Sequence, residues 1–144
     1  MHYKIYYFTR TGNCKRIAEA LSKKLSCESE QILDDQNWKG WLGWLKAGFY
    51  SSLDRKVKIQ VPQDLQEISE KIVVAPVWAN KIAPAVRELL KLIPAGSVHL
   101  VISSIDTRFN ELPDYLSVTH ITQKSGNETE MINQLAETLT KTPT

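Results

Sequence analysis

The stretch "YKIYYFTRTGNCKRIAEAL", Tyr3 to Leu21, changes from one kind of structure to another within a few residues. Its first part, Tyr3 to Phe8, is rich in β-branched and aromatic residues, which predicts a strand. Residues Asn13 to Leu25 carry apolar side chains at helical spacing, which predicts a helix. The small polar loop between them, Thr9 to Cys14, therefore follows the carboxyl end of a strand. In α/β proteins this is where ligands bind.

Strand and helix patterns alternate along the rest of the chain. Strands are predicted at 28–33, 70–75, 98–102 and 116–121, and helices from 84 and from 127. The run at 70–75 is almost wholly apolar, as expected for a strand buried on both faces. This order of elements predicts an α/β fold with an open, mostly parallel sheet wrapped by helices. No repeat or linker divides the chain, so one domain, 1–144, is expected.

The composition of the chain narrows the class of protein. The 144 residues are 42% apolar and 24% charged, which suits a globular domain with a core. A net charge of +2, with scattered basic residues, does not suggest nucleic-acid binding. The longest apolar run, 72–79, is too short to cross a membrane. Cys14 and Cys27 predict neither a disulfide framework nor a metal site, and no signal peptide is recognisable, so the expected location is the cytoplasm.

The loop "TRTGNC", Thr9 to Cys14, offers hydroxyl groups, a glycine and an asparagine directly before a helix. Main-chain N–H groups at a helix N-terminus are unpaired and carry a partial positive charge, so they attract phosphate. Gly12 allows a sharp turn and a close approach to a ligand. A simpler interpretation is that Thr11 or Asn13 caps the helix, and spacing alone leaves both open.

Two segments of the chain resemble the flavodoxin family. "TRTGNC" followed by "KRIAEAL" is similar to the phosphate loop and first helix of that family, and "APVWANKIAPAVRELL", residues 75–90, is similar to the end of its third strand and the next helix. The resemblance implies a flavodoxin-like open parallel five-stranded sheet with strand order 2-1-3-4-5 and helices on both faces. It also implies non-covalently bound flavin mononucleotide (FMN). The stretch 103–116 is short, so the fourth helix is expected to be shortened or absent.

Carried onto this sequence, the resemblance places the phosphate on the backbone of residues 10–14, with Thr9, Thr11 and Asn13 adding side-chain hydrogen bonds. The flavin ring is expected near the turn after residue 75, with a second aromatic from Phe109 or Tyr115. No catalytic residue is assigned. The predicted cofactor-binding residues are Thr9, Arg10, Thr11, Gly12, Asn13, Cys14, Pro76, Val77, Trp78, Ala79, Asn80, Ser104, Asp106, Thr107 and Phe109.

Cys14 and Trp78 each allow two interpretations. The family usually has Thr at the position of Cys14, and a thiol is a weak donor, so weaker FMN binding is expected. Cys14 is interpreted as a tolerated small substitute, although a thiol in a first helical turn near basic residues could also be reactive. Trp78 is predicted to lie against the flavin, and the alternative is that it packs on its own helix and covers the edge of the sheet.

The segment 37–56 is a tryptophan-rich insertion. One helical face is predicted from Trp38, Trp41, Leu42, Leu45, Phe49 and Leu53, with Asp35 or Asn37 as a cap. The main expectation is that this face is core and covers the sheet. Trp44 and Tyr50 fall off that face, which suggests an additional docking surface for a homodimer, through Trp38 to Tyr50, or for a redox partner.

The function predicted from these features is FMN binding with electron transfer to a redox partner protein or a small-molecule electron acceptor. Flavodoxins that resemble this chain are usually acidic, whereas this chain is slightly basic, which weakens electrostatic steering toward basic partners. Two alternatives remain open. One is a flavin-dependent reductase or oxidase of a small molecule such as a quinone or porphyrin, and the other is a binding module that has kept the fold and lost FMN.

Overall fold

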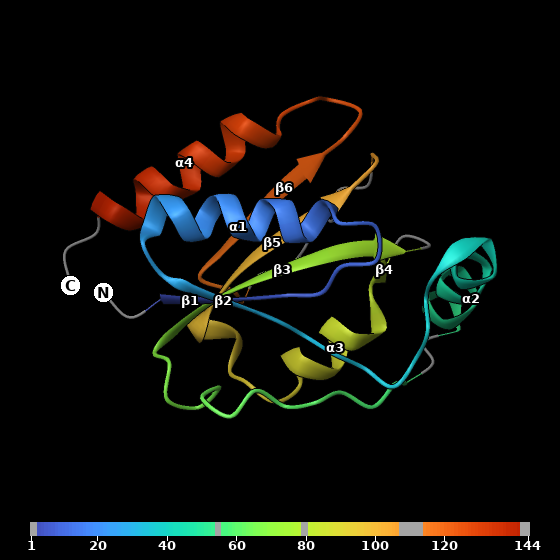
Figure 1. Ribbon diagram of the computed structural model, residues 1–144. Coiled ribbons are helices and arrows are strands. Elements are labelled where there is room, and N and C mark those ends of the chain that lie inside the picture. Colours follow the sequence, from blue (N-terminus) through green and yellow to red (C-terminus); the bar gives the residue numbers. More distant parts are fainter. Residues whose placement is uncertain (1–2, 54–55, 79–80, 107–113, 142–144) are drawn as a thin grey trace.

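A parallel sheet forms the centre of the molecule. The computed structural model describes residues 3–53, 56–78, 81–106 and 114–141 (Figure 1). The parallel strands are β1 (Tyr3–Tyr7), β2 (Glu28–Gln31), β3 (Glu70–Trp78), β5 (Val98–Ser104) and β6 (Ser117–Thr122). They lie in the order β2-β1-β3-β5-β6. Counted along the chain, this is the order 2-1-3-4-5 that the resemblance to flavodoxins implies, so the predicted fold class is confirmed.

Two features of the sheet differ from the prediction. The strand predicted at 70–75 continues to Trp78, because Pro76 still pairs with Ser103 of β5. A short strand, β4 (Lys81–Ile82), then turns back antiparallel to β3 and pairs Ile82 with Val77. Two residues are too few to show any periodicity, so the sequence carries no signal for β4.

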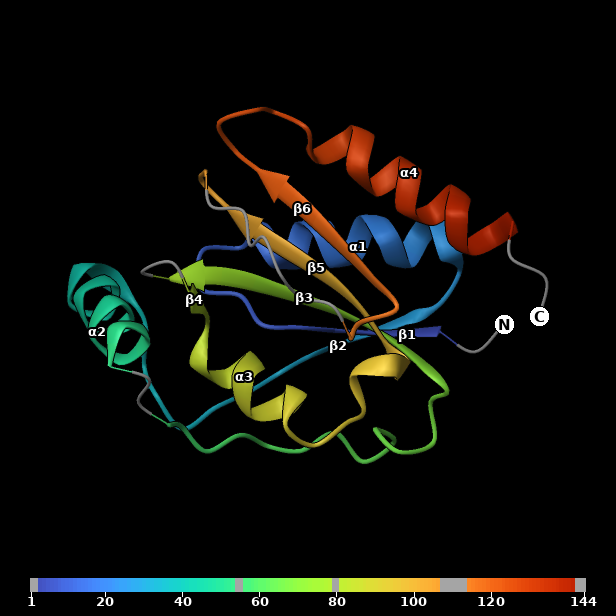
Figure 2. The ribbon, with the colours of Figure 1, turned by 180° about the vertical axis from the view of Figure 1, so that it is seen from behind.

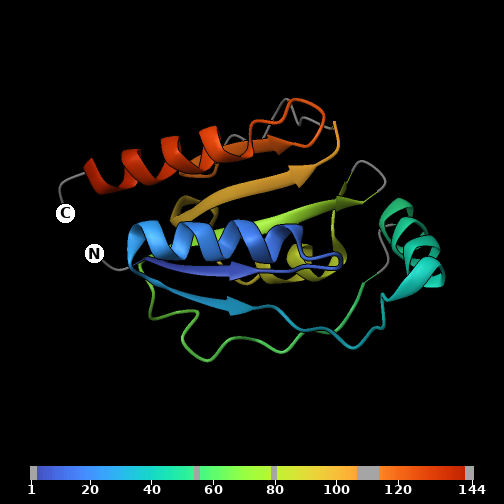
Figure 3. The same cartoon turned by 45° about the horizontal axis from the view of Figure 1, so that its top comes forward.

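The helices occupy three positions around the sheet. Helices α1 (Asn13–Leu25) and α4 (Glu128–Lys141) cover one face, whereas α3 (Pro84–Leu90) and a 3₁₀ turn, η1 (Ala95–Ser97), lie on the other (Figures 1 and 2). Helix α2 (Gly40–Ser52) covers neither face and lies beyond the carboxyl ends of the strands (Figure 3). Among residues 105–106 and 114–116, the described part of the connection from β5 to β6, none is helical.

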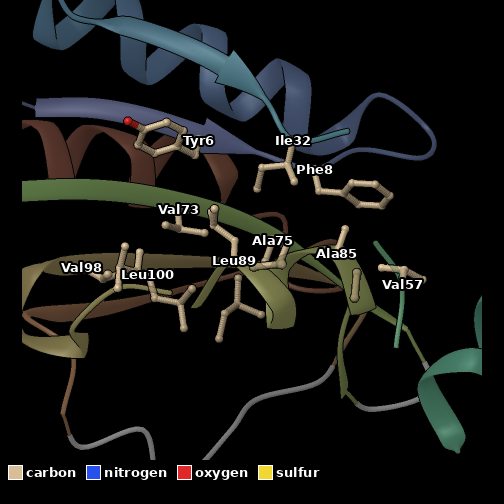
Figure 4. Packing of buried hydrophobic residues seen from close by; sticks show 14 of the residues in the cluster. Tyr6, Phe8, Ile32, Val57, Val73, Ala75, Ala85, Leu89, Val98 and Leu100 are labelled. Atoms are coloured by element: carbon tan, nitrogen blue, oxygen red, sulfur yellow. The ribbon is translucent and has the colours of Figure 1, made fainter. Parts of the chain in front are cut away.

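Buried apolar side chains fill both faces of the sheet. On one face, Ile17 and Leu21 of α1 pack with Leu135 of α4 over β3 and its neighbours. On the other face, Leu89 of α3 packs against Val73 of β3 and the strands beside it (Figure 4). This two-sided burial explains why the central strands have apolar sequences with little alternation.

One buried ion pair ties the sheet to the segment that follows α2. Lys4 is only 7% exposed, and its Nζ donates to Asp64 at 2.5 Å and to Glu30 at 2.8 Å. The Tyr6 hydroxyl also donates to Asp64, at 2.9 Å. A buried ammonium needs such partners, because removing one leaves a charge without full compensation.

We expect Asp64→Asn to lower the free energy of unfolding at pH 7 by about 1–2 kcal/mol, because it removes the charge that faces Lys4. The hydrogen bond from Lys4 lowers the pKa of Asp64 below its ordinary value of 3.8. The ion pair therefore stabilises the fold above about pH 4, and its contribution is lost as the pH falls through the lowered pKa. Urea denaturation at several pH values measures both effects.

Glu67→Gln is the matched control, because it removes the same charge from an exposed neighbouring side chain. We expect it to change stability by less than about 0.5 kcal/mol. Equal losses in the two variants would show that Asp64 has no special role.

Candidate functional site

The loop between β1 and α1 is set by one side chain and one glycine. The Thr9 Oγ1 accepts a hydrogen bond from the Gly12 N–H at 2.9 Å, and Gly12 has a φ of +96°, in the left-handed region. The first helical bond runs from the Arg16 N–H to the Gly12 carbonyl at 3.0 Å. Within the described part of the chain no side chain caps α1, so neither Thr11 nor Asn13 has the capping role that the simpler interpretation gave it. The N–H groups of the first helical turn thus have no partner within the helix.

The side chain of Asn13 lies in a short polar chain at the start of α1. Its Oδ1 accepts from Arg16 Nη1 at 3.0 Å. Arg16 in turn donates to both carboxylate oxygens of Glu128, at 2.6 and 2.9 Å, and so links α1 to the start of α4. Asn13 can still donate through Nδ2, while Arg16 is already engaged.

A cavity of about 570 Å³ opens at the carboxyl ends of the strands. It lies beside the point where the strand order reverses, since the chain passes from β1 outward to β2 and then back across to β3. Open α/β sheets bind ligands at such a point. The cavity is lined by Thr9, Arg10, Thr11, Asn13, Cys14, Trp44, Leu45, Ala47, Gly48, Phe49, Pro76, Val77, Trp78, Ser103, Ser104, Ile105 and Gln123.

The structure brings most of the predicted residues to this cavity. The lining contains the predicted residues Thr9, Arg10, Thr11, Asn13, Cys14, Pro76, Val77, Trp78 and Ser104. Gly12 shapes the loop without lining the cavity. Asp106 is not in the lining; it is exposed, and its carboxylate lies 3.4 Å from Lys124 Nζ. Tyr115 packs against the α3 side of the sheet instead. The predictions for Ala79, Asn80, Thr107 and Phe109 fall outside the described residues.

The cavity also has walls that the site prediction did not include. One wall comes from Trp44, Leu45 and Phe49 of α2, a segment far away in the sequence. Gln123 follows β6, and its N–H donates to the Ser104 carbonyl at 2.9 Å, which joins the loops after β5 and β6. The only sequence signal for these residues was the unusual density of aromatic residues in 37–56 and the position of Gln123 after a predicted strand.

Helix α2 is attached to the sheet by Arg10 and a column of aromatic rings. Arg10 donates from Nε to the Trp38 carbonyl at 3.0 Å and from Nη2 to the Gly40 carbonyl at 2.9 Å. The Trp78 ring lies 4.9 Å from that of Trp38 and 5.6 Å from that of Phe8, measured between centroids. Trp78 therefore lines the cavity and also packs within the protein, while its predicted contact with a flavin stays a prediction.

The expectation that one face of the tryptophan-rich helix forms core is wrong. Only Trp38 of that face is buried, and it precedes the helix. The rest of the predicted face is exposed, namely Trp41, Leu42, Leu45, Phe49 and Leu53. Ala47 and Tyr50 pack against the body instead. A Cβ at Gly43 would lie 2.0 Å from the Trp38 carbonyl oxygen, so only glycine fits at this position.

The charge of the cavity favours an anion. None of the described lining residues is acidic, and Arg10 is the one charged side chain among them. The partial positive charge at the start of α1 adds to this. The polar groups lie along the loop after β1, at the end of β5 and just after β6, whereas α2 and β3 contribute aromatic and aliphatic surface.

Cys14 is a buried thiol. It is 1% exposed and packs with Ile17 and Ala18 on the α1 side of the sheet. Burial raises the pKa of Cys14 to about 12, although its hydrogen bond with Ser103 acts in the opposite direction. The interpretation of Cys14 as a reactive thiol is therefore wrong, and its role as a small packed residue fits the structure.

We expect Cys14 to resist thiol reagents in the native protein. In a Cys27→Ser variant at pH 8, the remaining thiol should react with a disulfide reagent roughly a thousandfold more slowly in the native state than in urea. In Cys14→Ala, the half-buried Cys27 should react faster than native Cys14 does. Native Cys14 that reacted within about tenfold of its unfolded rate would contradict the burial described above.

The comparisons with known proteins concern mainly the fold. No family model matches the chain. An uncharacterized protein from Archaeoglobus fulgidus is 26% identical over 98 residues, or 68% of this chain, and the matched part spans 62% of that relative's length.

The fold of this chain is similar to that of several solved structures over nearly its whole length. A candidate flavoprotein from Bacteroides uniformis has a TM-score of 0.72 at 17% identity, over 94% of this chain and 97% of that one. A flavoprotein from Lactobacillus acidophilus, solved in complex with FMN, has a TM-score of 0.61 at 16% identity, over 90% and 97%. Oxidised flavodoxin 1 from Bacillus cereus has a TM-score of 0.54 at 10% identity, over 98% and 99%. These similarities confirm the flavodoxin-like fold.

Proposed function

We propose that this protein binds FMN in the cavity beyond β1, β3 and β5 and serves as an electron carrier. The observation that supports this most is the position of the cavity, at the reversal of strand order and beside the uncapped start of α1. A structural neighbour of the same fold is a flavoprotein solved with FMN. We further propose the cytoplasm as its location and a redox protein or a small electron acceptor as its partner.

The residues present fit the phosphate of such a cofactor. The N–H groups at the start of α1 are free of side-chain caps, and Thr11 and Asn13 can add hydrogen bonds from the cavity wall. Cys14 contributes its main chain only, because its thiol is buried and bonded with Ser103. The cavity volume lies within the range of roughly 300–1,000 Å³ that is common for ligand sites.

The protein's contribution would be to hold and shield the cofactor. When bound, FMN would supply the transfer of one or two electrons. Trp78, Leu45 and Phe49 would exclude water from one side of the cavity, while Ser104 offers a hydroxyl group on the other. Because Phe8 and Trp38 pack against Trp78, the tryptophan ring is fixed before any ligand arrives.

Thr11→Asp tests the phosphate site directly. Thr11 is exposed and lines the cavity, so a carboxylate there should repel the phosphate. We expect the Kd for FMN to rise at least about tenfold, or about 1.4 kcal/mol, as measured by quenching of flavin fluorescence.

Thr11→Asn is the matched control, since it has the shape of Asp without the charge. Riboflavin, which lacks the phosphate, should lose much less affinity than FMN in the Asp variant. If both ligands weakened equally, the phosphate would not lie at this loop. A wild-type protein that left FMN fluorescence unchanged would favour a binding module that has lost the cofactor.

A second candidate function is reduction or oxidation of a small molecule such as a quinone or porphyrin. It is favoured by the wall of Trp44, Leu45 and Phe49, which gives the cavity apolar surface beyond the polar loops. We expect an enzyme of this kind to turn over a quinone with a reduced nicotinamide, and Phe49→Ser to raise the KM for the quinone. An electron carrier would show almost no such turnover without a separate reductase.

A further inference from the structure

Helix α2 exposes an apolar surface that the described chain does not cover. Trp41 and Leu42 are 70% and 65% exposed, and Leu53 just after the helix is 58% exposed. Leu45 and Phe49 lie between them at helical spacing. We define these five residues, Trp41, Leu42, Leu45, Phe49 and Leu53, as the α2 outer face.

The composition of α2 indicates that its outer face has a partner. The side of the helix toward the body carries Gly43, Ala47 and Tyr50, so α2 is apolar nearly all round. A helix of that kind is normally covered on all sides, yet α2 is covered on one. An exposed surface of this density marks an interaction site.

The charge of the sequence around α2 favours an anionic partner. The insertion 37–56 contains four basic residues and one acidic residue, which gives +3. Of these, Lys39 and Lys56 flank the helix and are exposed, whereas Lys46 lies over the rings of Trp38 and Tyr50. The whole chain carries +2, so the rest of the sequence carries −1. Asp34, which precedes the insertion, accepts a hydrogen bond from Trp38 on the side of the body. A second copy of this chain would bring like charges together, whereas an anionic surface would be attracted.

We propose that the α2 outer face binds the surface of an anionic lipid bilayer. Exposed tryptophan, leucine and phenylalanine side chains can enter the interfacial layer of a bilayer, and Lys39 and Lys56 flank them on either side of α2. Each lysine or arginine near an anionic surface adds to the attraction. Helix α2 lies beyond the ends of the strands (Figure 3), and its side chains Trp41 and Leu42 are largely exposed.

This mode of attachment needs no membrane span. None of the helices within the described residues is long and apolar enough to cross a bilayer. Leu45 and Phe49 belong both to the outer face and to the cavity lining, so the cavity would open close to the lipid. The proposal does not require FMN, because it depends only on the surface of α2.

Vesicle binding tests the proposal. In a sedimentation assay, we expect the protein to bind vesicles of phosphatidylcholine and phosphatidylglycerol in equal amounts. Its affinity for them should be at least about tenfold higher than for vesicles of phosphatidylcholine alone. Raising the salt to about 0.5 M should release most of it, because surface charges are then screened. Tryptophan emission should shift to the blue on binding, since Trp41 would leave water.

Two pairs of variants separate the apolar and the charged contributions. Leu42→Gln with Leu53→Gln should weaken binding to anionic vesicles about tenfold or more, whereas Leu33→Gln with Leu92→Gln, which alters two exposed leucines elsewhere, should not. Lys39→Glu with Lys56→Glu should also weaken binding, whereas Lys23→Glu with Lys24→Glu on α1 should have little effect. Circular dichroism confirms that each variant is folded.

Three outcomes would overturn the proposal. One is folded wild-type protein that does not sediment with anionic vesicles. Another is a Leu42→Gln, Leu53→Gln variant that binds as tightly as wild type. The third is a wild-type protein that binds no vesicles and is a dimer in sedimentation velocity, while the same variant is a monomer. That result would make the outer face an interface between two copies.

Discussion

The hydrogen bond from the Gly12 N–H to Thr9 Oγ1 sets the geometry on which the site depends. It closes a tight loop directly after β1, and the left-handed conformation of Gly12 turns the chain into α1 without a side-chain cap. A residue with a Cβ would be strained at that φ, although the space around Gly12 is open. The constraint at Gly12 is therefore conformational. Because of it, the free N–H groups of α1 lie beside the cavity.

A second set of contacts determines what the other side of the cavity looks like. Arg10 reaches out of the same loop and bonds the carbonyl groups of Trp38 and Gly40, which places the start of α2. Trp38 is held in turn by Trp78 and by the Asp34 carboxylate, at 2.8 Å from its Nε1. Burial raises the pKa of Asp34 above its ordinary value, although the hydrogen bond from Trp38 acts in the opposite direction. One loop thus positions both the polar and the apolar wall of the cavity.

Much of the fold was predictable because it depends on local patterns. The bounds of α1, Asn13–Leu25, agree with the prediction, since the apolar period and the preceding glycine are both local signals. The strand order came from the resemblance, because a parallel sheet pairs strands that are far apart in sequence. The hairpin of β3 and β4 had no signal at all.

The orientation of α2 shows why the rest of the site could not be predicted. Helical periodicity identifies an apolar arc but not the direction in which that arc faces. Here Trp41, Leu42 and Leu53 are exposed, whereas Ala47 and Tyr50 pack against the body and Gly43 lies where a Cβ would meet the Trp38 backbone. The usual rule that large apolar residues are inside fails where backbone contact takes precedence. The cavity wall made by Leu45 and Phe49 follows from that inversion.

The position of Cys14 bears on how an anion would be held. Its thiol is buried with Ile17 and Ala18 of α1 and bonds with Ser103 at the end of β5, so it ties the helix to the sheet. The donors that remain at this point are main-chain N–H groups, supplemented by Thr11 and Asn13. Main-chain donors are independent of side-chain identity, provided that Gly12 keeps the loop in shape. At the proposed phosphate site, the first turn of α1 would therefore supply the larger share of the attraction, and the Cys14 thiol would contribute little.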